Sequence, residues 1–211
     1  MLAKAVKPQA LSVLRPLTGL LVRAGVGPNL LTFLGFIVSC LAGVLYAVGP
    51  LGWAAATFLF AGLFDLLDGA VAREAKRASR FGAFLDSNVD RFAEIVVFVG
   101  ILWRFQGEPV TLVAVLLAIT GSLMVSYTKA RAEGLGEGVS GGLLQRPERI
   151  VLLVLGSFFG ETGLRVTVWI LAGLTNATSV QRMVLVAAAM TGTQETEAAD
   201  GEPIAAETGE T

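Results

Sequence analysis

The stretch LFDLLDGAVAREAKRASRFGAFLDSNVDRF, residues 63–92, decides how the rest of this chain folds. It contains four aspartates, and apolar runs flank it on both sides. Asp65 and Asp68 are three residues apart, while Asp86 and Asp90 are four apart, so each pair lies on one face of a helix. The segment between the pairs is short and charged, which makes the two helices antiparallel neighbours. Four carboxylates are therefore expected to converge at one end of this helix pair.

The composition of the chain is that of a membrane-embedded protein. Of its 211 residues, 54% are hydrophobic and 16% are charged, whereas a soluble domain is about a quarter charged. The length favours a single domain. One cysteine, Cys40, provides no disulfide framework, and the chain has no histidine. A metal site would therefore use oxygen ligands, which suit hard cations such as Mg²⁺.

Hydropathy predicts an all-α integral membrane protein with six transmembrane helices. A topology with six spans puts every Lys and Arg except Arg104 and Arg165 at one face, so both termini and the carboxylates are expected to face the cytoplasm from the cell membrane. The fifth segment is short for a helix that has to cross the apolar core. The expected spans are 29–48, 52–73, 83–103, 109–128, 148–162 and 164–188.

The two ends of the chain differ from this central part. Residues 1–28 carry leucines at helical spacing beside basic residues, which predicts an amphipathic helix on the membrane surface rather than a signal peptide. Residues 191–211 include six acidic residues and no basic one, which predicts a disordered acidic tail in the cytoplasm. The transmembrane domain is thus expected at 29–190.

Four carboxylates at one depth would repel each other, and partial burial raises the cost. Two bridged Mg²⁺ ions would balance the four charges, in the arrangement used for phosphoryl transfer. The alternative is that the acids form structural ion pairs with Arg73, Arg80 and Arg91. Single acids in membranes are often paired in this way, but four on adjacent helices favour metal binding.

The spacing of these residues also resembles a known signature. Asp65-x2-Asp68-Gly69-x2-Ala72-Arg73-x8-Gly82-x3-Asp86-x3-Asp90 is similar, at every fixed position, to the motif of the CDP-alcohol phosphotransferase family. The resemblance implies six transmembrane helices, commonly in a homodimer, and an enzyme that transfers a phosphatidyl group from a CDP-linked lipid to an alcohol, releasing CMP. It implies that Asp65, Asp68 and Asp86 hold two Mg²⁺ ions, or Mn²⁺, and that Asp90 assists the metals and acts as the base.

The resemblance further implies a nucleotide pocket lined by Gly69, Arg73, Gly82 and Ala83. The string GPNLLT, residues 27–32, opens the first expected span and is also similar to the family pattern. It adds three candidates for contact with the CDP-lipid, namely Pro28, Asn29 and Thr32. The alternative for Asn29 is that it only caps a helix beginning at Pro28.

Basic residues from three expected helices are predicted beside the carboxylates: Lys129, Arg131, Arg146, Arg149 and Arg182. Such a cluster suits an acceptor alcohol that already carries a phosphate, whereas the alternative is that these residues only anchor the cytoplasmic face. The strings SYTKARAE, residues 126–133, and RPERI, residues 146–150, resemble the phosphatidylinositol phosphate synthases within the family. This likeness implies that Lys129, Arg149 and Arg182 hold the phosphate of myo-inositol phosphate and that CDP-diacylglycerol is the donor.

Other functions are consistent with parts of this pattern. Glycerol-3-phosphate is an alternative acceptor, giving phosphatidylglycerophosphate, and an ether-linked CDP-lipid is an alternative donor. Outside this class, the chain could be a multi-span cation transporter, but transporters usually carry such acids near the middle of the membrane and contain repeated halves. A purely structural role would leave the carboxylates unexplained. Nucleic acid is not an expected partner.

Overall fold

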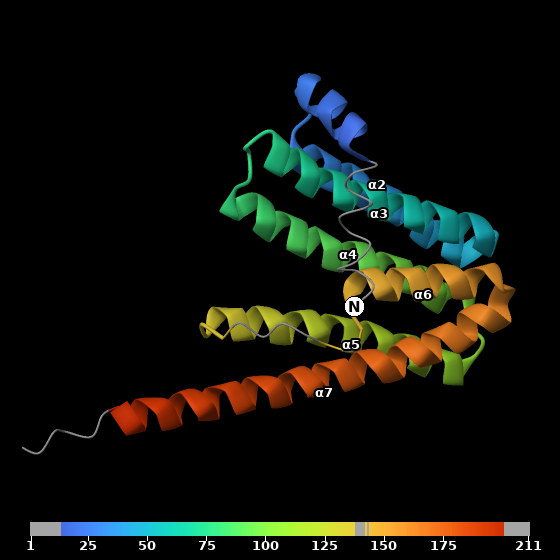
Figure 1. Cartoon of the computed structure of the whole chain (residues 1–211). Coiled ribbons are helices and arrows are strands. Elements are labelled where there is room, and N and C mark those ends of the chain that lie inside the picture. The colour runs from blue at the N-terminus through green and yellow to red at the C-terminus, as the bar shows by residue number, and fades with distance from the viewer. Residues whose placement is uncertain (1–13, 138–141, 143, 201–211) are drawn as a thin grey trace, which may run out of the picture.

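The structure, a computed structural model, describes residues 14–137, 142 and 144–200, and its regular elements are all helices within these ranges. Residues 14–23 form a short helix. Six longer helices follow it along the chain (Figure 1). These are α2 (Pro28–Val48), α3 (Leu51–Glu74), α4 (Arg80–Arg104), α5 (Pro109–Gly134), α6 (Arg146–Phe158) and α7 (Gly160–Asp200). Each expected span overlaps one of the six, although the fifth, 148–162, runs past the end of α6 into α7. The all-α prediction is confirmed.

Local sequence signals account for where these helices begin. Pro28 and Pro109 occupy the first turns of α2 and α5, where a missing N–H costs nothing. Ser79 is the N-cap of α4, and its hydroxyl accepts a hydrogen bond from the Gly82 N–H at 3.0 Å. The turn from α6 into α7 runs through Gly160, whose φ of +73° is easily adopted by glycine.

Four helices are long and apolar enough to cross a membrane: α2, α3, α5 and the first 32 residues of α7. Of the six longer helices, α4 and α6 fall short by this measure. α4 is long enough, but it carries Asp90, Arg91 and Glu94 within its length. α6 has 13 residues and is therefore about 20 Å long, less than the hydrocarbon core of about 30 Å. The expectation of six spans thus stays a prediction.

The helices pack as a bundle in which α2 contacts α3 and α4, α5 contacts α7, and α6 contacts α3 and α7. Figure 1 shows α6 as a short helix lying between the α3–α4 side and α7. Small residues allow the closest approaches: a Cβ added to Gly100 of α4 would overlap the carbonyl oxygen of Gly43 in α2. Large apolar side chains such as Trp53, Phe60 and Val99 are exposed on the outside. Apolar exteriors around interiors with some polar groups suit a protein solvated by lipid.

Two ion pairs close the end of the bundle that lies away from the aspartates. Arg165 donates to both carboxylate oxygens of Glu108, at 2.9 and 2.6 Å, and these hydrogen bonds hold the pKa of the Glu108 carboxyl below its usual range. Arg104 pairs with Glu161 at 3.0 Å and also donates to backbone carbonyls at the end of α2. Arg104 and Arg165, the two basic residues that the sequence analysis separated from the others, therefore both lie at this end of the bundle.

The terminal segments are described only in part. The helix at residues 14–23 packs through Leu14 and Leu21 on a small cluster that includes Leu67 and Val71 of α3. The remainder of the expected interfacial helix, residues 1–13, lies outside the described residues. α7 continues to Asp200, into the expected tail, while residues 201–211 lie outside the described ranges. The division of the chain at residues 28 and 190 stays a prediction.

Candidate functional site

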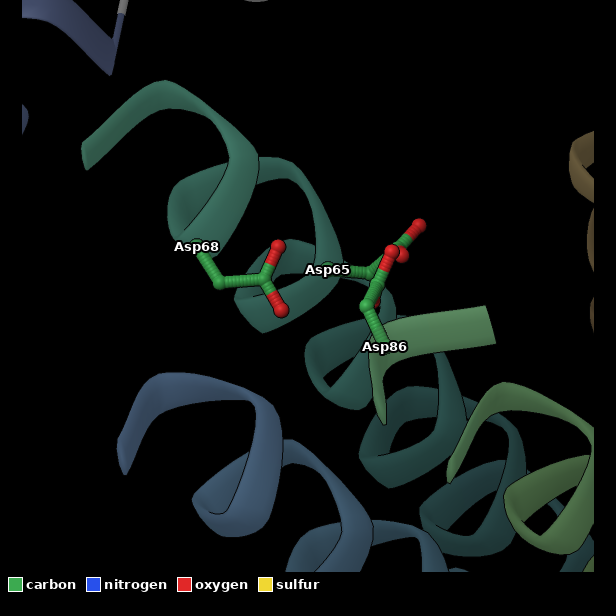
Figure 2. Close-up of side chains that lie close together, drawn as sticks. All are labelled: Asp65, Asp68 and Asp86. Atoms are coloured by element: carbon green, nitrogen blue, oxygen red, sulfur yellow. The ribbon is translucent and has the colours of Figure 1, made fainter. Parts of the chain in front are cut away.

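Three of the four aspartates converge where the end of α3 meets the beginning of α4. One carboxylate oxygen from each of Asp65, Asp68 and Asp86 lies within 4.8 Å of the others. Figure 2 shows the Asp65 and Asp86 carboxylates side by side, with the Asp68 carboxylate directed toward them from one turn further along α3. The convergence predicted from the i,i+3 spacing and the antiparallel helix pair is confirmed for these three residues.

The chemistry of this cluster fits a divalent cation. Its donors are all carboxylate oxygens, which hard cations such as Mg²⁺ and Mn²⁺ prefer. Asp86 Oδ1 is buried and has no hydrogen-bond partner among the described residues. A buried, unpaired carboxylate oxygen is costly, and coordination of a cation would satisfy it. An adjoining cavity is lined by residues that include Thr32, Asp65, Asp68 and Asp90. Its volume of about 20 Å³ is enough for one water molecule or ion.

Thr32 supports the cluster from the neighbouring helix α2. Its hydroxyl donates to Asp68 Oδ2 at 2.7 Å, and Thr32 and Asp68 are both buried, at 8% and 4% exposed. This bond occupies one Asp68 oxygen and fixes the orientation of the carboxylate. The sequence analysis assigned Thr32 to the nucleotide, whereas its hydroxyl in the structure contacts the carboxylate cluster.

Asp90 stands slightly apart and is paired with arginines. Its Oδ2 lies 2.6 Å from Nη1 of Arg146, in the first turn of α6, and 3.6 Å from Nη2 of Arg91. The same Arg146 nitrogen is 3.2 Å from Asp65 Oδ2. Arg146 was expected among the residues for the acceptor's phosphate, but its guanidinium contacts the aspartates. Of the arginines considered as structural partners for the four aspartates, Arg91 forms an ion pair in the described residues, while Arg73 and Arg80 form none there.

The remaining nucleotide candidates lie at the beginnings of α2 and α4 and near the end of α3. A Cβ on Gly82, in the first turn of α4, would be 3.4 Å from Asn29 Oδ1, so the beginnings of α2 and α4 lie close together. Asn29 does not cap α2, because Gly27 occupies the N-cap and no side chain caps the helix, so that alternative is wrong. Arg73 is exposed, and its guanidinium lies over Gly69, whose added Cβ would be 3.3 Å from Nη1. Pro28 is at the first turn of α2 and Ala83 is exposed on α4.

The structure brings two of the predicted acceptor residues together inside the bundle. Arg149 of α6 is 2% exposed and Arg182 of α7 is 7% exposed. Their guanidinium groups are near enough for the two charges to repel each other. Arg182 Nη1 donates to the Val125 carbonyl at 2.6 Å, one turn before Lys129 on α5. Lys129 itself is exposed and 3.5 Å from Glu133.

Arg131 differs from these residues, because it is exposed near the end of α5 and forms no ion pair among the described residues. Glu94 was missed by the sequence analysis, although it is buried and accepts two hydrogen bonds from Arg149. The signal for it was available, because Glu94 follows Asp86 and Asp90 at the same four-residue spacing on one face of α4.

Comparison with known proteins identifies relatives over most of the chain. The model of the CDP-alcohol phosphatidyltransferase family matches residues 26–194. The chain is 39% identical over 181 residues to phosphatidylinositol phosphate synthase of Mycobacteroides abscessus, covering 81% of this chain and 82% of that protein. It is also 39% identical over 168 residues to archaetidylinositol phosphate synthase of Methanothermobacter thermautotrophicus, covering 78% of this chain and 85% of the relative.

Solved structures agree with these sequence relationships. The crystal structure of Mycobacterium tuberculosis phosphatidylinositol phosphate synthase with CDP-DAG bound matches with a TM-score of 0.75 and 37% identity, covering 81% of this chain and 92% of that one. A structure of the same enzyme in complex with manganese and citrate also has a TM-score of 0.75, at 37% identity, covering 81% of this chain and 87% of the other. Because the family model spans the whole aspartate site and these relatives cover about four-fifths of the sequence, the chain belongs to the CDP-alcohol phosphatidyltransferase family.

Proposed function

We propose that this protein transfers the phosphatidyl group of CDP-diacylglycerol to a hydroxyl of myo-inositol phosphate, giving phosphatidylinositol phosphate and CMP. The observation that carries the proposal is the carboxylate triad, Asp65, Asp68 and Asp86, which Arg146 of α6 contacts through Asp65, together with two buried arginines further inside the bundle, Arg149 of α6 and Arg182 of α7. Carboxylates suit the metal ions of phosphoryl transfer, and buried arginines suit a phosphorylated acceptor. The names of the relatives support the same acceptor, because each contains inositol phosphate.

The aspartates are proposed to hold two Mg²⁺ ions, which Mn²⁺ could replace, with Asp65, Asp68 and Asp86 as the principal ligands and Asp90 assisting. When bound, the ions would neutralise the donor's pyrophosphate and the charge that develops on the leaving CMP. The chain's own contribution begins with Thr32, which holds Asp68 in a fixed orientation through the 2.7 Å hydrogen bond. Ligands held in this way lose little entropy when an ion binds.

Asp90 is proposed as the base for the transfer itself. The acceptor hydroxyl gives its proton to an Asp90 carboxylate oxygen, its oxygen forms a bond to the phosphatidyl phosphorus, and the bond from that phosphorus to CMP breaks. Arg146, 2.6 Å from Asp90, favours the charged form that can accept a proton. In this view Arg146 serves the base and the metal ligands more directly than it serves the acceptor's phosphate.

The nucleotide is proposed to lie over the small residues at the helix ends. Gly69, Gly82 and Ala83 leave room for it, while Arg73 and Asn29 are exposed there as polar contacts. Pro28 begins α2 at this position, and Thr32 contributes through Asp68.

The acceptor's phosphate is proposed to bind Arg149, Arg182 and Lys129, which come from α6, α7 and α5. Arginines provide several N–H donors in a fixed plane, which matches a phosphate. Arg131 is a weaker candidate because it is exposed and lies apart from the buried pair.

The arrangement in the membrane is part of the proposal. Six helices would cross or enter the bilayer, with residues 1–28 along its surface and both termini in the cytoplasm. The site would then face the cytoplasm, where CMP is released, while the lipid tails of the donor remain among the exposed apolar side chains. A homodimer is the proposed assembly.

An acceptor screen tests this function. Purified protein is given CDP-diacylglycerol, Mg²⁺ and one alcohol at a time: myo-inositol phosphate, glycerol-3-phosphate, free inositol or serine. Release of CMP is expected with inositol phosphate and not with the unphosphorylated alcohols, and an Asp86→Asn variant provides the inactive control. Activity with glycerol-3-phosphate but none with inositol phosphate would overturn the choice of acceptor. A parallel series with an ether-linked CDP-lipid determines which donor is used.

A further inference from the structure

Glu94 and Arg149 form a buried ion pair one turn deeper than the aspartate site. Arg149 Nε donates to Glu94 Oε1 at 2.9 Å, and Arg149 Nη2 donates to Glu94 Oε2 at 3.2 Å. The residues are 7% and 2% exposed, so both charges are removed from solvent. Burying a carboxylate and a guanidinium is expensive, and replacing such a pair by apolar residues is often neutral for stability. Stability alone therefore gives a weak reason for this pair.

The pair connects two helices that do not pack closely through their backbones, because α4 and α6 are not among the helix pairs in extensive contact. Two successive ion pairs between long side chains connect these helices. Asp90 reaches Arg146, and Glu94, four residues later on α4, reaches Arg149, three residues later on α6. The Asp90–Arg146 pair lies at the metal site, and the Glu94–Arg149 pair lies one helical turn further along α4, on the side of Arg182.

The way Glu94 holds Arg149 leaves part of the guanidinium available. A guanidinium has five N–H groups, and Glu94 accepts from two of them, on Nε and Nη2. Nη1 forms no hydrogen bond among the described residues. Because the guanidinium is planar and two hydrogen bonds hold one edge of it on Glu94, the direction of the remaining N–H groups is fixed.

The N–H groups that remain on Arg149 suit an anion. Glu94 occupies Nε and Nη2, so the donors on Nη1 point in a fixed direction without an acceptor among the described residues. A phosphate provides both acceptor oxygens and negative charge for such donors.

We propose that Glu94 is a positioning residue for the acceptor: it orients Arg149 so that its Nη1 edge binds the acceptor's phosphate. This inference rests on the proposed function, in which Arg149 contacts that phosphate. An arginine held in its binding orientation loses less conformational freedom when the ligand arrives, so it binds more tightly than a free one. Glu94 acts through Arg149 and does not touch the reacting atoms.

The primary test is Glu94→Gln, which keeps the size of the side chain and removes its charge. The KM for myo-inositol phosphate is expected to rise about tenfold, while the KM for CDP-diacylglycerol and the kcat at saturating acceptor change by less than about twofold. Glu94→Asp keeps the charge but draws Arg149 back by one methylene, and it should give an acceptor KM between those of the wild type and Glu94→Gln. A structural role would lower the melting temperature without this separation of the two KM values.

A double-mutant cycle tests whether Glu94 works through Arg149. Arg149→Gln alone and Glu94→Gln with Arg149→Gln are expected to have the same acceptor KM, because orientation is irrelevant once the guanidinium is gone. Effects that multiply would overturn the proposal. The double variant also leaves no unpaired buried charge, so it provides the measurement if Glu94→Gln does not fold. Wild-type-like acceptor KM in the double variant would contradict the proposal equally.

Glu108→Gln is the matched control, because Glu108 accepts an equivalent pair of hydrogen bonds from Nε and Nη2 of Arg165 at the other end of the bundle. That variant is expected to keep both KM values. Different results would refute the proposed function and the role of Glu94. A wild-type protein without activity on inositol phosphate would refute the proposed function, whereas an active wild type with unchanged acceptor KM in Glu94→Gln would refute only the role of Glu94.

Discussion

Thr32→Val removes one hydrogen bond from the metal site and leaves the shape of the side chain almost unchanged. The Thr32 hydroxyl has a single proton and two acceptors within reach, Asp68 Oδ2 at 2.7 Å and the Pro28 carbonyl at 3.2 Å. The shorter bond goes to a charged oxygen, so the Thr32 hydroxyl donates its hydrogen bond chiefly to Asp68. The substitution therefore leaves a buried carboxylate without its donor.

The expected magnitude follows from the burial and charge of this bond. A hydrogen bond to a charged group contributes about 1.5–3 kcal/mol. At about 1.4 kcal/mol per factor of ten, this corresponds to roughly a 10–100-fold loss of metal affinity, as found for residues that orient metal ligands. The kcat at saturating metal should change much less, because every ligand remains.

Calorimetric titration of the purified protein with Mn²⁺ measures the metal affinity directly. A second measurement is the Mg²⁺ concentration that gives half-maximal CMP release. Thr120→Val is the matched control, since the Thr120 hydroxyl is exposed and donates only to carbonyls of its own helix. Metal affinity of Thr32→Val within about twofold of the wild type would refute the reasoning. A raised KM for CDP-diacylglycerol with unchanged metal affinity would instead return Thr32 to the nucleotide pocket.

Other parts of the structure lead to further expectations. EDTA should stop CMP release and Mg²⁺ or Mn²⁺ should restore it, while Asp86→Asn should remain inactive after metal is added and should bind Mn²⁺ more weakly by calorimetry. Lys129→Ala should raise the acceptor KM and leave the donor KM unchanged in steady-state assays. Gly100→Ala should destabilise the protein by about 1–3 kcal/mol, because the new methyl meets the Gly43 backbone, and thermal unfolding in detergent should show a lower Tm. Gly62→Ala, also in a helix but with open space at its Cβ, should leave the Tm unchanged or raise it.

Much of the helical framework could be predicted from local signals. Pro28 and Pro109 mark helix beginnings because proline is compatible only with the first turn, and Gly49 with Pro50 separates α2 from α3. The expected fifth segment, 148–162, was assigned as a span from its hydropathy, but α6 has only 13 residues and turns into α7 at Gly160. Hydropathy placed the break between the fifth and sixth segments after the polar residues 161 and 162, whereas the turn lies at Gly160, whose positive φ hydropathy does not report.

The candidate site was predictable where its geometry is set within one helix pair. Asp65 and Asp68 share a face because they lie three residues apart in α3, and Asp86 meets them because the connection to α4 is short. Contacts between distant segments were not predictable in this way. Arg146 was assigned to the acceptor on its charge, yet it binds Asp65 and Asp90, and nothing in its local sequence encodes that distance.

The sequence by itself determined that the chain is helical, that it is apolar enough for a membrane, and that aspartates of α3 and α4 converge, although it predicted four in the cluster and the structure brings three together. These properties depend on composition and on periodicities of a few residues. Only the tertiary structure decided which arginine faces which acid: Arg146 with Asp90, and Arg149 with Glu94. The physical reason is that α6 is placed by its packing on α3 and α7, so the partners of its side chains depend on contacts between segments far apart in the chain.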